Sequence, residues 1–406
     1  MVTRSFLFIS CCLLSVCVSA ADMLARNTAP VAIEAHLQNS DYEQRLLSAI
    51  EWISKNEMDH AIEALQRLTQ EKPDFRLAQL IYGDLLMAQS RPIKDFGNHY
   101  TASYQQIQAL REEAIKRLQH NQFQFDDRKI PSQLVELSDK QKHIVMVDMQ
   151  AARLYLFENV QGQPRLLHDF YISIGKKGYE KYFEGDQKTP RGVYFVTSYI
   201  EPSRLTDLYG AGAFPINYPN LWDQRNKRTG SGIWLHGTPT DTYSRPPRDS
   251  NGCVVLTNQD FNLIAPYIDV NDTPVILTDK IDWIEPQEWL QQQSDYRSLL
   301  DQWRKDWESR DADRYLSHYS IEFQGFGNNY QSWVSYKKRV NPSKSFIKVG
   351  IDDTSIFRYP GEKDMLVFTF SQDYRSDNFR RQFLKRQYWI KEEDGKWRIL
   401  YEENVS

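Results

Sequence analysis

The spacing of hydrophobic residues changes twice along this chain of 406 residues, and each spacing permits a different kind of secondary structure. Over residues 22–140 the apolar residues recur every three or four positions, which is typical of amphipathic helices. Over residues 142–280 they form short runs separated by glycine and proline, which favours strands. Over residues 290–406 helical spacing comes first and strand-like runs follow. The sequence therefore predicts a multidomain protein with three folded regions of different class.

The first region is predicted to be a helical module. Apolar residues at helical spacing predict helices over 42–55 and 58–71; Pro73 ends the second helix, and Phe75 begins a third. Two antiparallel helices with small residues at their crossing, followed by another helix, resemble a tetratricopeptide-type hairpin. Binding of a partner protein is one possible role of this module.

The second region is predicted to be a mostly-β domain, sandwich- or barrel-like. One helix is expected to interrupt it, from Asn258, as the N-cap, to Ile268. The long connections over 178–188 and 201–230 are candidates for function, because long loops in compact domains tend to be functional. The strand-like runs are Ile144–Val147, Leu154–Phe157, Phe170–Ile174, Val193–Tyr199, Ile233–Leu235 and Pro274–Leu277.

The third region begins with a helix that carries Leu300, Trp303 and Trp307 on one face, and a second short helix is expected over 311–319. Helices followed by an antiparallel sheet resemble the cone-shaped nuclear-transport-factor-like fold, an α+β fold that often holds a pocket. Such a widespread fold says little about function. With no cysteine and no evident acid–histidine pair, the region is predicted to bind or position. Its strand-like runs are Phe346–Ile351, Met365–Tyr374, Arg381–Lys391 and Trp397–Glu402.

The first twenty residues have the features of an export signal. Arg4 gives a positive start, Phe6–Val18 is apolar, and small residues at 18–20 precede Ala21 as a cleavage site. The apolar stretch is short for a membrane span of about 20 residues. Lipid attachment at Cys17 and an uncleaved anchor are the less favoured alternatives. We expect a signal peptide over 1–20, no transmembrane span in the mature chain, and a periplasmic protein of the cell envelope.

The charge and the residue types of the chain argue against nucleic-acid binding and against a metal site. A net charge of −4 and the absence of a dense basic patch argue against a nucleic-acid partner. Apart from His236 and Cys253, the residue types that bind zinc are scattered, with no second cysteine beside Cys253 and no His-x-x-x-His spacing. We therefore expect no metal and no cofactor.

Cys253 is the only cysteine outside the signal segment, where Cys11, Cys12 and Cys17 lie. An exported protein with one thiol has no disulfide to form within its own chain, and a free thiol in an oxidising compartment is at risk of oxidation. Such a thiol is either a reactive nucleophile or a small apolar core residue, and the thiol alone leaves both roles open. His236 lies upstream in the same region, and a cysteine with a histidine is sufficient for acyl transfer.

The residues around the thiol suit this chemistry. Gly252 permits an unusual backbone conformation and leaves room for a substrate at the sulfur. The backbone N–H groups of Gly252 and Cys253 are candidates for an oxyanion hole, together with the neighbouring Ser250 and Asn251. His236 could stabilise the thiolate and later protonate a leaving amine. The alternative for His236 is a structural histidine at the end of a strand.

Five ordered segments resemble the catalytic domain of the L,D-transpeptidase (YkuD-like) family. The segments are Ile172–Gly175, Gly185–Gly192, Ile233–Gly237, Ser250–Val254, and Asn258 with Asp260. The resemblance implies a bacterial cell-wall enzyme whose cysteine, here Cys253, attacks a carbonyl of peptidoglycan peptide stems next to diaminopimelate. It also implies that the carbonyl of Gly237 orients His236, and that an amine or water then accepts the acyl group.

One position departs from the family pattern. Crosslinking members carry an arginine two residues after the cysteine, where this chain has Val255. Arg245 and Arg248 are candidates to supply a replacement charge, although a solvated surface is the more common fate of either one.

The domain order is similar to that of L,D-carboxypeptidases that trim tetrapeptide stems and affect cell shape in curved and helical bacteria. This likeness implies trimming of tetrapeptides to tripeptides. Two alternatives stay open. One is an L,D-transpeptidase that forms 3-3 crosslinks or protein–peptidoglycan links. The other is a non-catalytic wall-binding scaffold built on the same fold.

Overall fold

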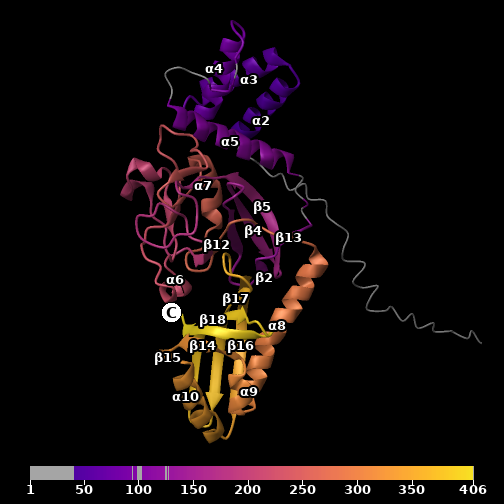
Figure 1. The fold of residues 1–406 in the computed structure, drawn as a ribbon, viewed down its shortest axis with the longest axis vertical. Helices are drawn as coiled ribbons and strands as arrows, with labels where there is room; N and C mark the ends of the chain where they lie inside the picture. The colour runs from indigo at the N-terminus through magenta and orange to yellow at the C-terminus, as the bar shows by residue number, and fades with distance from the viewer. Residues whose placement is uncertain (1–40, 94, 98–102, 124–125, 127, 406) are drawn as a thin grey trace, which may run out of the picture. The chain divides into compact units, whose positions relative to one another are not determined.

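The structure is a computed structural model (Figure 1). It describes residues 41–93, 95–97, 103–123, 126 and 128–405. The expected signal peptide over 1–20 lies outside the described residues. No helix within the described part of the chain is both long and apolar enough to cross a membrane.

The N-terminal region is helical, as predicted. It comprises α2 (Asp41–Ser54), α3 (Met58–Glu71), α4 (Arg76–Ala88) and α5 (Tyr104–Gln122). The first two helices agree with the predicted bounds to within one residue, because their apolar faces make the core of this region. The buried residues of that core include Leu46, Ala49, Ala61, Leu65, Leu68, Phe75 and Ala78.

The sequence predicted helical structure as far as residue 140, and this prediction was wrong. The segment after α5 forms β1 (Ile130–Pro131) and β2 (Leu134–Glu136). The partner of β1 is β13 (Trp283–Ile284), and the partner of β2 is β16 (Ile347–Arg358). Both partners lie far along the chain, so local spacing could not reveal this pairing.

The middle region is mostly β, as predicted. Its largest sheet has the strand order β5-β4-β3-β12-β7. The strands are β3 (His143–Asp148), β4 (Arg153–Val160), β5 (Gln163–Tyr171), β7 (Gly192–Phe195) and β12 (Pro274–Thr278). The predicted run to Tyr199 was too long, since β7 ends at Phe195.

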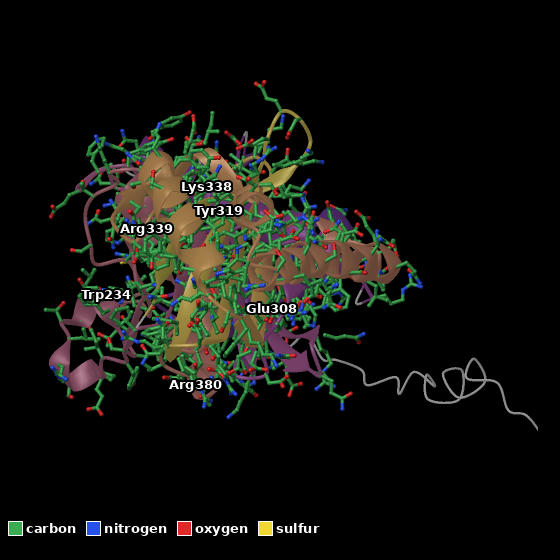
Figure 2. All side chains as sticks on the ribbon, turned by 90° about the horizontal axis from the view of Figure 1, so that it is seen from below. Trp234, Glu308, Tyr319, Lys338, Arg339 and Arg380 are labelled. Carbon is green, nitrogen blue, oxygen red and sulfur yellow. The ribbon has the colours of Figure 1, made fainter. Side chains whose placement is uncertain are left out.

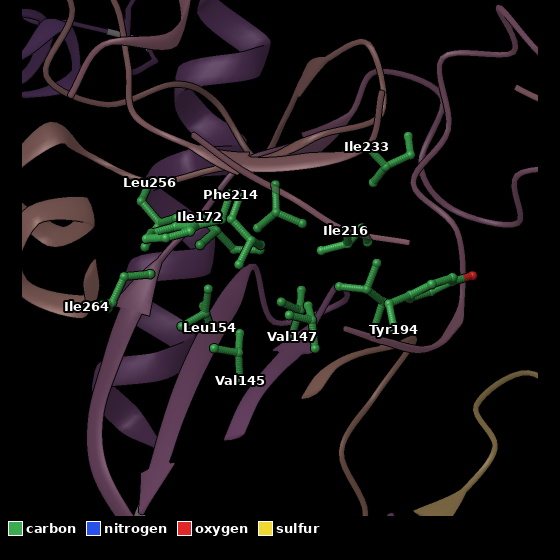
Figure 3. Packing of buried hydrophobic residues seen from close by; sticks show 14 of the residues in the cluster. Val145, Val147, Leu154, Ile172, Tyr194, Phe214, Ile216, Ile233, Leu256 and Ile264 are labelled. Atoms are coloured by element: carbon green, nitrogen blue, oxygen red, sulfur yellow. The ribbon is translucent and has the colours of Figure 1, made fainter. Parts of the chain in front are cut away.

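Both faces of this sheet are buried, and β3 shows how. Val145 and Val147 point into the core of the middle region (Figure 3). Ile144 and Met146 point the other way and pack in a cluster with residues of the C-terminal region such as Phe357. Successive side chains of a strand alternate between faces, so a strand covered on both sides becomes the continuous apolar run seen in the sequence.

A second, smaller sheet packs over the same core and carries the candidate site. Its order is β11-β9-β8, with β8 (Ala213–Pro215), β9 (Trp234–His236) and β11 (Val254–Val255). Phe214, Ile233 and Leu256 come from this layer and its flanks and meet the larger sheet (Figure 3). A separate two-stranded pair joins β6 (Ile174–Gly175) to β10 (Arg248–Ser250), and β10 ends three residues before Cys253.

The predicted helix of the middle region is α7 (Asn258–Ile264), continued by a 3-10 turn, Ala265–Tyr267. The N-cap prediction was wrong by one residue. Thr257 is the N-cap, and its side chain accepts a hydrogen bond from the backbone N–H of Asp260. Threonine is a good N-cap in its own right, and its position leaves the Asn258 amide for other contacts.

The C-terminal region packs helices against a curved sheet with the order β15-β14-β19-β18-β17-β16-β2. The helices are α8 (Pro286–Glu308), α9 (Ala312–Leu316) and α10 (Tyr330–Ser343). The strands not yet given are β14 (Tyr319–Gly325), β15 (Asn328–Asn329), β17 (Met365–Ser376), β18 (Arg380–Lys391) and β19 (Trp397–Asn404). The helix–sheet core predicted from Trp303 and Trp307 is present.

Three elements of this region were not predicted: β14, the two-residue strand β15, and α10. In α10 only Trp333, Lys337 and Asn341 are buried, so its apolar stripe is too sparse to reveal a helix. Figure 2 labels Tyr319 on β14, and Lys338 and Arg339 on α10, the helix that packs against β14.

Candidate active site

The pairing of two short strands brings the candidate nucleophile and base together. Strands β9 and β11 are parallel, with Val254 opposite Leu235 and Val255 opposite His236. The N–H of Leu256 donates to the carbonyl of His236 at 2.9 Å, which extends the pairing. Cys253 directly precedes β11, so this register places it opposite Trp234, the first residue of β9, two residues before His236.

His236 is buried and held in one tautomer. Its Nδ1 lies 2.6 Å from the carbonyl oxygen of Gly237, which is the orientation that the family resemblance implied. A carbonyl only accepts, so Nδ1 carries the proton and Nε2 keeps a free lone pair. Burial lowers the pKa of His236 to about 4; the Gly237 hydrogen bond opposes this shift and the charge of Arg245 adds to it. The imidazole is therefore neutral near pH 7 and able to accept a proton.

The Cys253 thiol is partly exposed and is protonated at rest. Its Sγ donates to the carbonyl oxygen of Gly232 at 3.3 Å. Burial of the sulfur raises the pKa of Cys253 to about 11, against the backbone N–H of Trp234 and the charges of Arg245 and Lys181, which lower it. The resting pair is a neutral thiol and a neutral imidazole. The thiolate must then form as the sulfur attacks, with a base to take its proton.

Hydrogen bonds hold the turn before the cysteine. Gly252 has φ +130, and a Cβ there would lie 2.8 Å from the carbonyl oxygen of Lys188, so only glycine fits. The Ser250 hydroxyl donates to the Cys253 carbonyl at 2.6 Å and accepts from the Gly252 N–H at 3.1 Å. The Thr189 hydroxyl donates to the Gly252 carbonyl at 3.0 Å.

These contacts change the predicted oxyanion hole. The Gly252 N–H is engaged with Ser250, so it is not free for a substrate oxygen, and Ser250 supports the turn. Asn251 is exposed at the same turn. The amide of Cys253 remains the candidate donor from the predicted pair.

The structure separates the two candidate arginines. Arg248 is exposed and pairs with Glu112 of α5 at 2.9 Å, so it faces the helical region. The Arg245 side chain is largely buried, and its Nε lies 3.5 Å from a carboxylate oxygen of Asp249. Its charge acts on both His236 and Cys253. Arg245 is therefore the better placed of the two candidates, and Arg248 pairs with the helical region instead.

Two further residues of the site, Tyr209 and Trp234, were not predicted individually. The ring of Tyr209 lies 5.0 Å from the ring of His236 and 4.8 Å from that of Trp234. The carbonyl of Tyr209 accepts from the Gly237 N–H at 3.1 Å. Tyr209 belongs to the long 201–230 connection, so this segment packs against the candidate base.

Asn258 ties that connection to the histidine strand. Its Oδ1 accepts from the N–H groups of Ala211 at 2.8 Å and Thr238 at 3.1 Å, and its Nδ2 donates to the Thr238 carbonyl at 2.8 Å. A Cβ on either Gly210 or Gly237 would lie 2.1 Å from this Oδ1. The two glycines let Asn258 approach the backbone on both sides, which fixes the carbonyl that orients His236.

The site holds two side chains of metal-binding type, His236 and Cys253. A catalytic zinc site needs three protein ligands. Across the described ranges, no group of three or more histidine, cysteine, aspartate or glutamate side chains is placed to hold a metal ion.

The C-terminal region contains a cavity of about 610 Å³. Among the groups lining it, Trp333 Nε1, both amide atoms of Asn341, and Gln372 Oε1 are buried without a hydrogen-bond partner. Unpaired buried polar groups at a cavity wall suit the binding role predicted for this region. An acid–histidine pair was not expected here, but His318 Nε2 lies 2.8 Å from an Asp306 oxygen, away from the cavity lining.

Lys337 of α10 lines this cavity and is predicted to reduce stability at neutral pH. Burial lowers its pKa to about 7, the charge of Lys385 adds to this, and Glu402 opposes it. A lysine in the unfolded chain has a pKa of about 10.4, so between pH 7 and that value the unfolded chain holds a proton that the folded chain has released. The lysine therefore costs stability below the unfolded pKa, and this cost shrinks as the pH rises towards it.

Lys337→Met is expected to raise the midpoint of thermal unfolding by several degrees at pH 7 and by much less near pH 10. Thermal melts of the full chain at both pH values measure this. Lys338→Met is the matched control, because Lys338 is exposed on the same helix and pairs with Asp313. An equal gain at both pH values, or a loss at pH 7, contradicts the prediction.

Comparison with known proteins agrees with the site and the fold. Residues 142–277 match the L,D-transpeptidase catalytic domain, and residues 295–403 match the Cds6 C-terminal NTF2-like domain. The structure of Bd1075 from Bdellovibrio bacteriovorus is 31% identical and covers 68% of this chain and 98% of its own, with a TM-score of 0.61. The chain belongs to the L,D-transpeptidase family.

A second relative of this L,D-transpeptidase-family chain is the helical cell shape determining protein Pgp2 from Campylobacter jejuni. Its structure is 28% identical, covers 67% of this chain and 95% of its own, and has a TM-score of 0.58. The structure of a mutant of that protein gives 27% identity and the same TM-score of 0.58. No curated protein matches the sequence.

These matches confirm the predicted family and fold class. The chain combines N-terminal helices, a mostly-β L,D-transpeptidase domain and a C-terminal NTF2-like domain, and it is an enzyme of a cysteine-dependent family. The predicted order of the last two domains agrees with the relatives.

Proposed function

We propose that this L,D-transpeptidase-family enzyme is a peptidoglycan L,D-carboxypeptidase. Cys253 is the nucleophile and His236 the general base and acid, and tetrapeptide stems are trimmed to tripeptides at the diaminopimelate–D-alanine bond. The observation that carries the proposal is the parallel β9–β11 pairing, which puts Cys253 and His236 on adjoining strands, with the imidazole oriented by the Gly237 carbonyl.

The reaction follows from the state of this pair. As Sγ attacks the stem carbonyl, His236 Nε2 takes the thiol proton, and a backbone N–H faces the developing oxyanion. The imidazolium then gives its proton to the amine of D-alanine as the C–N bond breaks, which leaves a thioester on Cys253. In the second half, His236 takes a proton from water as the water oxygen attacks the thioester. The tripeptide carboxylate leaves and the thiol is restored.

The choice of water as acceptor rests on the charges around the sulfur. Val255 occupies the position of the family arginine and is only 2% exposed, so its side chain is buried. Arg245 is then the arginine whose charge acts at the thiol. One fixed guanidinium fewer weakens the capture of a second charged stem, whereas the thioester still forms and water is present to resolve it.

We extend the proposal to the cellular role. One relative is named a helical cell shape determining protein, which supports a role in cell shape for this chain. The expected signal segment supports a periplasmic place of action. A protein partner at the helical module stays part of the same proposal.

The acceptor is tested with purified protein and disaccharide tetrapeptide. Tripeptide and free D-alanine are expected as the main products by mass spectrometry, without dimers, because one guanidinium is missing at the sulfur. The control adds an excess of disaccharide tripeptide, whose free amine can act as the acceptor, to the tetrapeptide donor. Main products that are 3-3 dimers would overturn hydrolysis and restore the transpeptidase alternative. No turnover of either kind would favour the wall-binding scaffold.

A further inference from the structure

The segment that joins His236 to Cys253, residues 238–250, is anchored on the helical region. Tyr243 at its centre is 4% exposed. Its ring lies 4.4 Å from that of Phe75 and 5.7 Å from that of Tyr42. The Tyr243 N–H donates to the Asp74 carbonyl at 3.3 Å. One aromatic side chain of the catalytic domain is thus part of the core of the helices.

A buried network of charges lies beside this anchor. Arg117 of α5 has a side chain that is 1% exposed, and it bonds Glu43 of α2 at 2.6 Å and Glu113 at 2.8 Å. Arg153 of β4 is completely buried and bonds Glu43 at 3.0 Å. Buried ions are retained in a fold only when their geometry is well satisfied. This network therefore requires the helices and the catalytic sheet in one arrangement.

Two hydrogen bonds lead from the network to adjacent residues of the segment. The Ser244 hydroxyl donates to Oε1 of Glu113 at 2.8 Å, the same oxygen that Arg117 bonds. The Tyr171 hydroxyl donates to the Arg245 carbonyl at 3.0 Å. The guanidinium carbon of Arg117 lies 3.8 Å from the centre of the Tyr171 ring. Arg117 thus contacts the acceptor of the first bond, Glu113, and the donor of the second, Tyr171.

We infer that the helical module is a positioning part of the active site: Glu113 fixes Ser244, and Arg117, stacked on Tyr171 of β5, supports the bond to Arg245, in the segment that joins His236 to Cys253. The inference deepens the proposed function, since it assigns positioning residues to the same site. It also gives the helical module a role that partner binding does not require.

The charges that face the thiol agree with this role. Burial raises the pKa of Cys253; the N–H of Trp234 and the charges of Arg245 and Lys181 lower it. Lys181 is held by its own buried pair with Asp186, at 2.7 Å, so its position does not depend on the 238–250 segment. Displacement of Arg245 should therefore remove one of two cationic contributions to the thiolate.

The test measures the rate of Cys253 alkylation by iodoacetamide against pH in the full chain. Arg245→Gln gives the full effect of the charge, and Tyr171→Phe with Ser244→Ala removes the two positioning hydrogen bonds. Both proteins are expected to show an apparent thiol pKa raised by about half a unit, which slows alkylation about threefold below that pKa. Ser244→Thr alone, which keeps the hydroxyl and leaves Tyr171 in place, is expected to be alkylated at the parental rate.

Tyr296→Phe is the matched control, because it removes a tyrosine hydroxyl that bonds Arg358 in the C-terminal region. Its alkylation profile is expected to equal that of the parent protein. An unchanged profile in Arg245→Gln overturns the role of the charge. A shift in Arg245→Gln but none in the double variant overturns the positioning by the helices. Arg245→Gln carries the test if the double variant does not fold.

Alkylation involves no peptidoglycan, so the experiment tests the positioning role of the helical module independently of the proposed carboxypeptidase function. Profiles that shift as expected in a protein that cleaves no stem would refute the proposed function and leave the positioning role. Stem cleavage by a protein whose profiles do not shift would do the reverse.

Discussion

Cys253→Ala is expected to abolish turnover of tetrapeptide stems and to leave the fold intact. Cys253 is the only cysteine outside the first twenty residues, so after the expected removal of that segment no second thiol is left to form the thioester. The thiol is partly exposed and donates to the Gly232 carbonyl, and alanine removes only the sulfur atom, so no large cavity is left. Product analysis by mass spectrometry, with a thermal melt of the same sample, measures both effects.

The Cys253→Ser variant is the control for shape, because a hydroxyl fills the site but is a far weaker nucleophile. It is expected to fold and to be inactive. Measurable stem cleavage by Cys253→Ala would end the thiol mechanism.

The state of the thiol adds a pH dependence to this result. The pKa of Cys253 is raised to about 11. Labelling of the parent protein should therefore be slow near pH 7 and rise about tenfold per pH unit towards that value.

The fold was predictable wherever the signal was local. Strands such as β3 and helices such as α2 bury one repeating face, and the period of that face is visible in the sequence. The positions of Cys253 and His236 were indicated by their motifs, and the structure places them at adjoining strands.

Features that depend on distant pairing were not predictable. Strand β2 joins the C-terminal sheet through Leu134 and Phe357, although the whole catalytic domain separates it from that sheet in sequence. Only the folded chain shows that the Ser250 hydroxyl accepts a hydrogen bond from the Gly252 N–H. The same holds for Asn258, whose partners are the backbone of loops remote in sequence.

The helical module shows the same limit. Arg117 and Glu43 occupy helix positions that would ordinarily be solvated, and nothing local distinguishes them from surface charges. Their burial becomes necessary only when β4 supplies Arg153. A single sequence could therefore predict the helices but not their contact with the site.

His236→Ala is expected to lower kcat by a factor of about 10² to 10⁴, the usual scale for a positioned acid–base group. The neutral imidazole, with its pKa lowered to about 4 by burial, has Nε2 free because Nδ1 donates to Gly237. With a thiol pKa of about 11, the thiolate is scarce near neutral pH. Loss of the base therefore lowers the rate at which the sulfur attacks the stem carbonyl. Single-turnover cleavage of tetrapeptide measures this effect.

His168→Ala is the matched control for the loss of a histidine. His168 lies on β5, and burial lowers its pKa as well, but its ring packs against Phe170 and Tyr267. We expect this variant to lose stability and to keep the parental rate per folded molecule. The reverse result, a His236→Ala protein that melts at a lower temperature but cleaves at the parental rate, would make His236 structural. The proton of Cys253 would then need another acceptor.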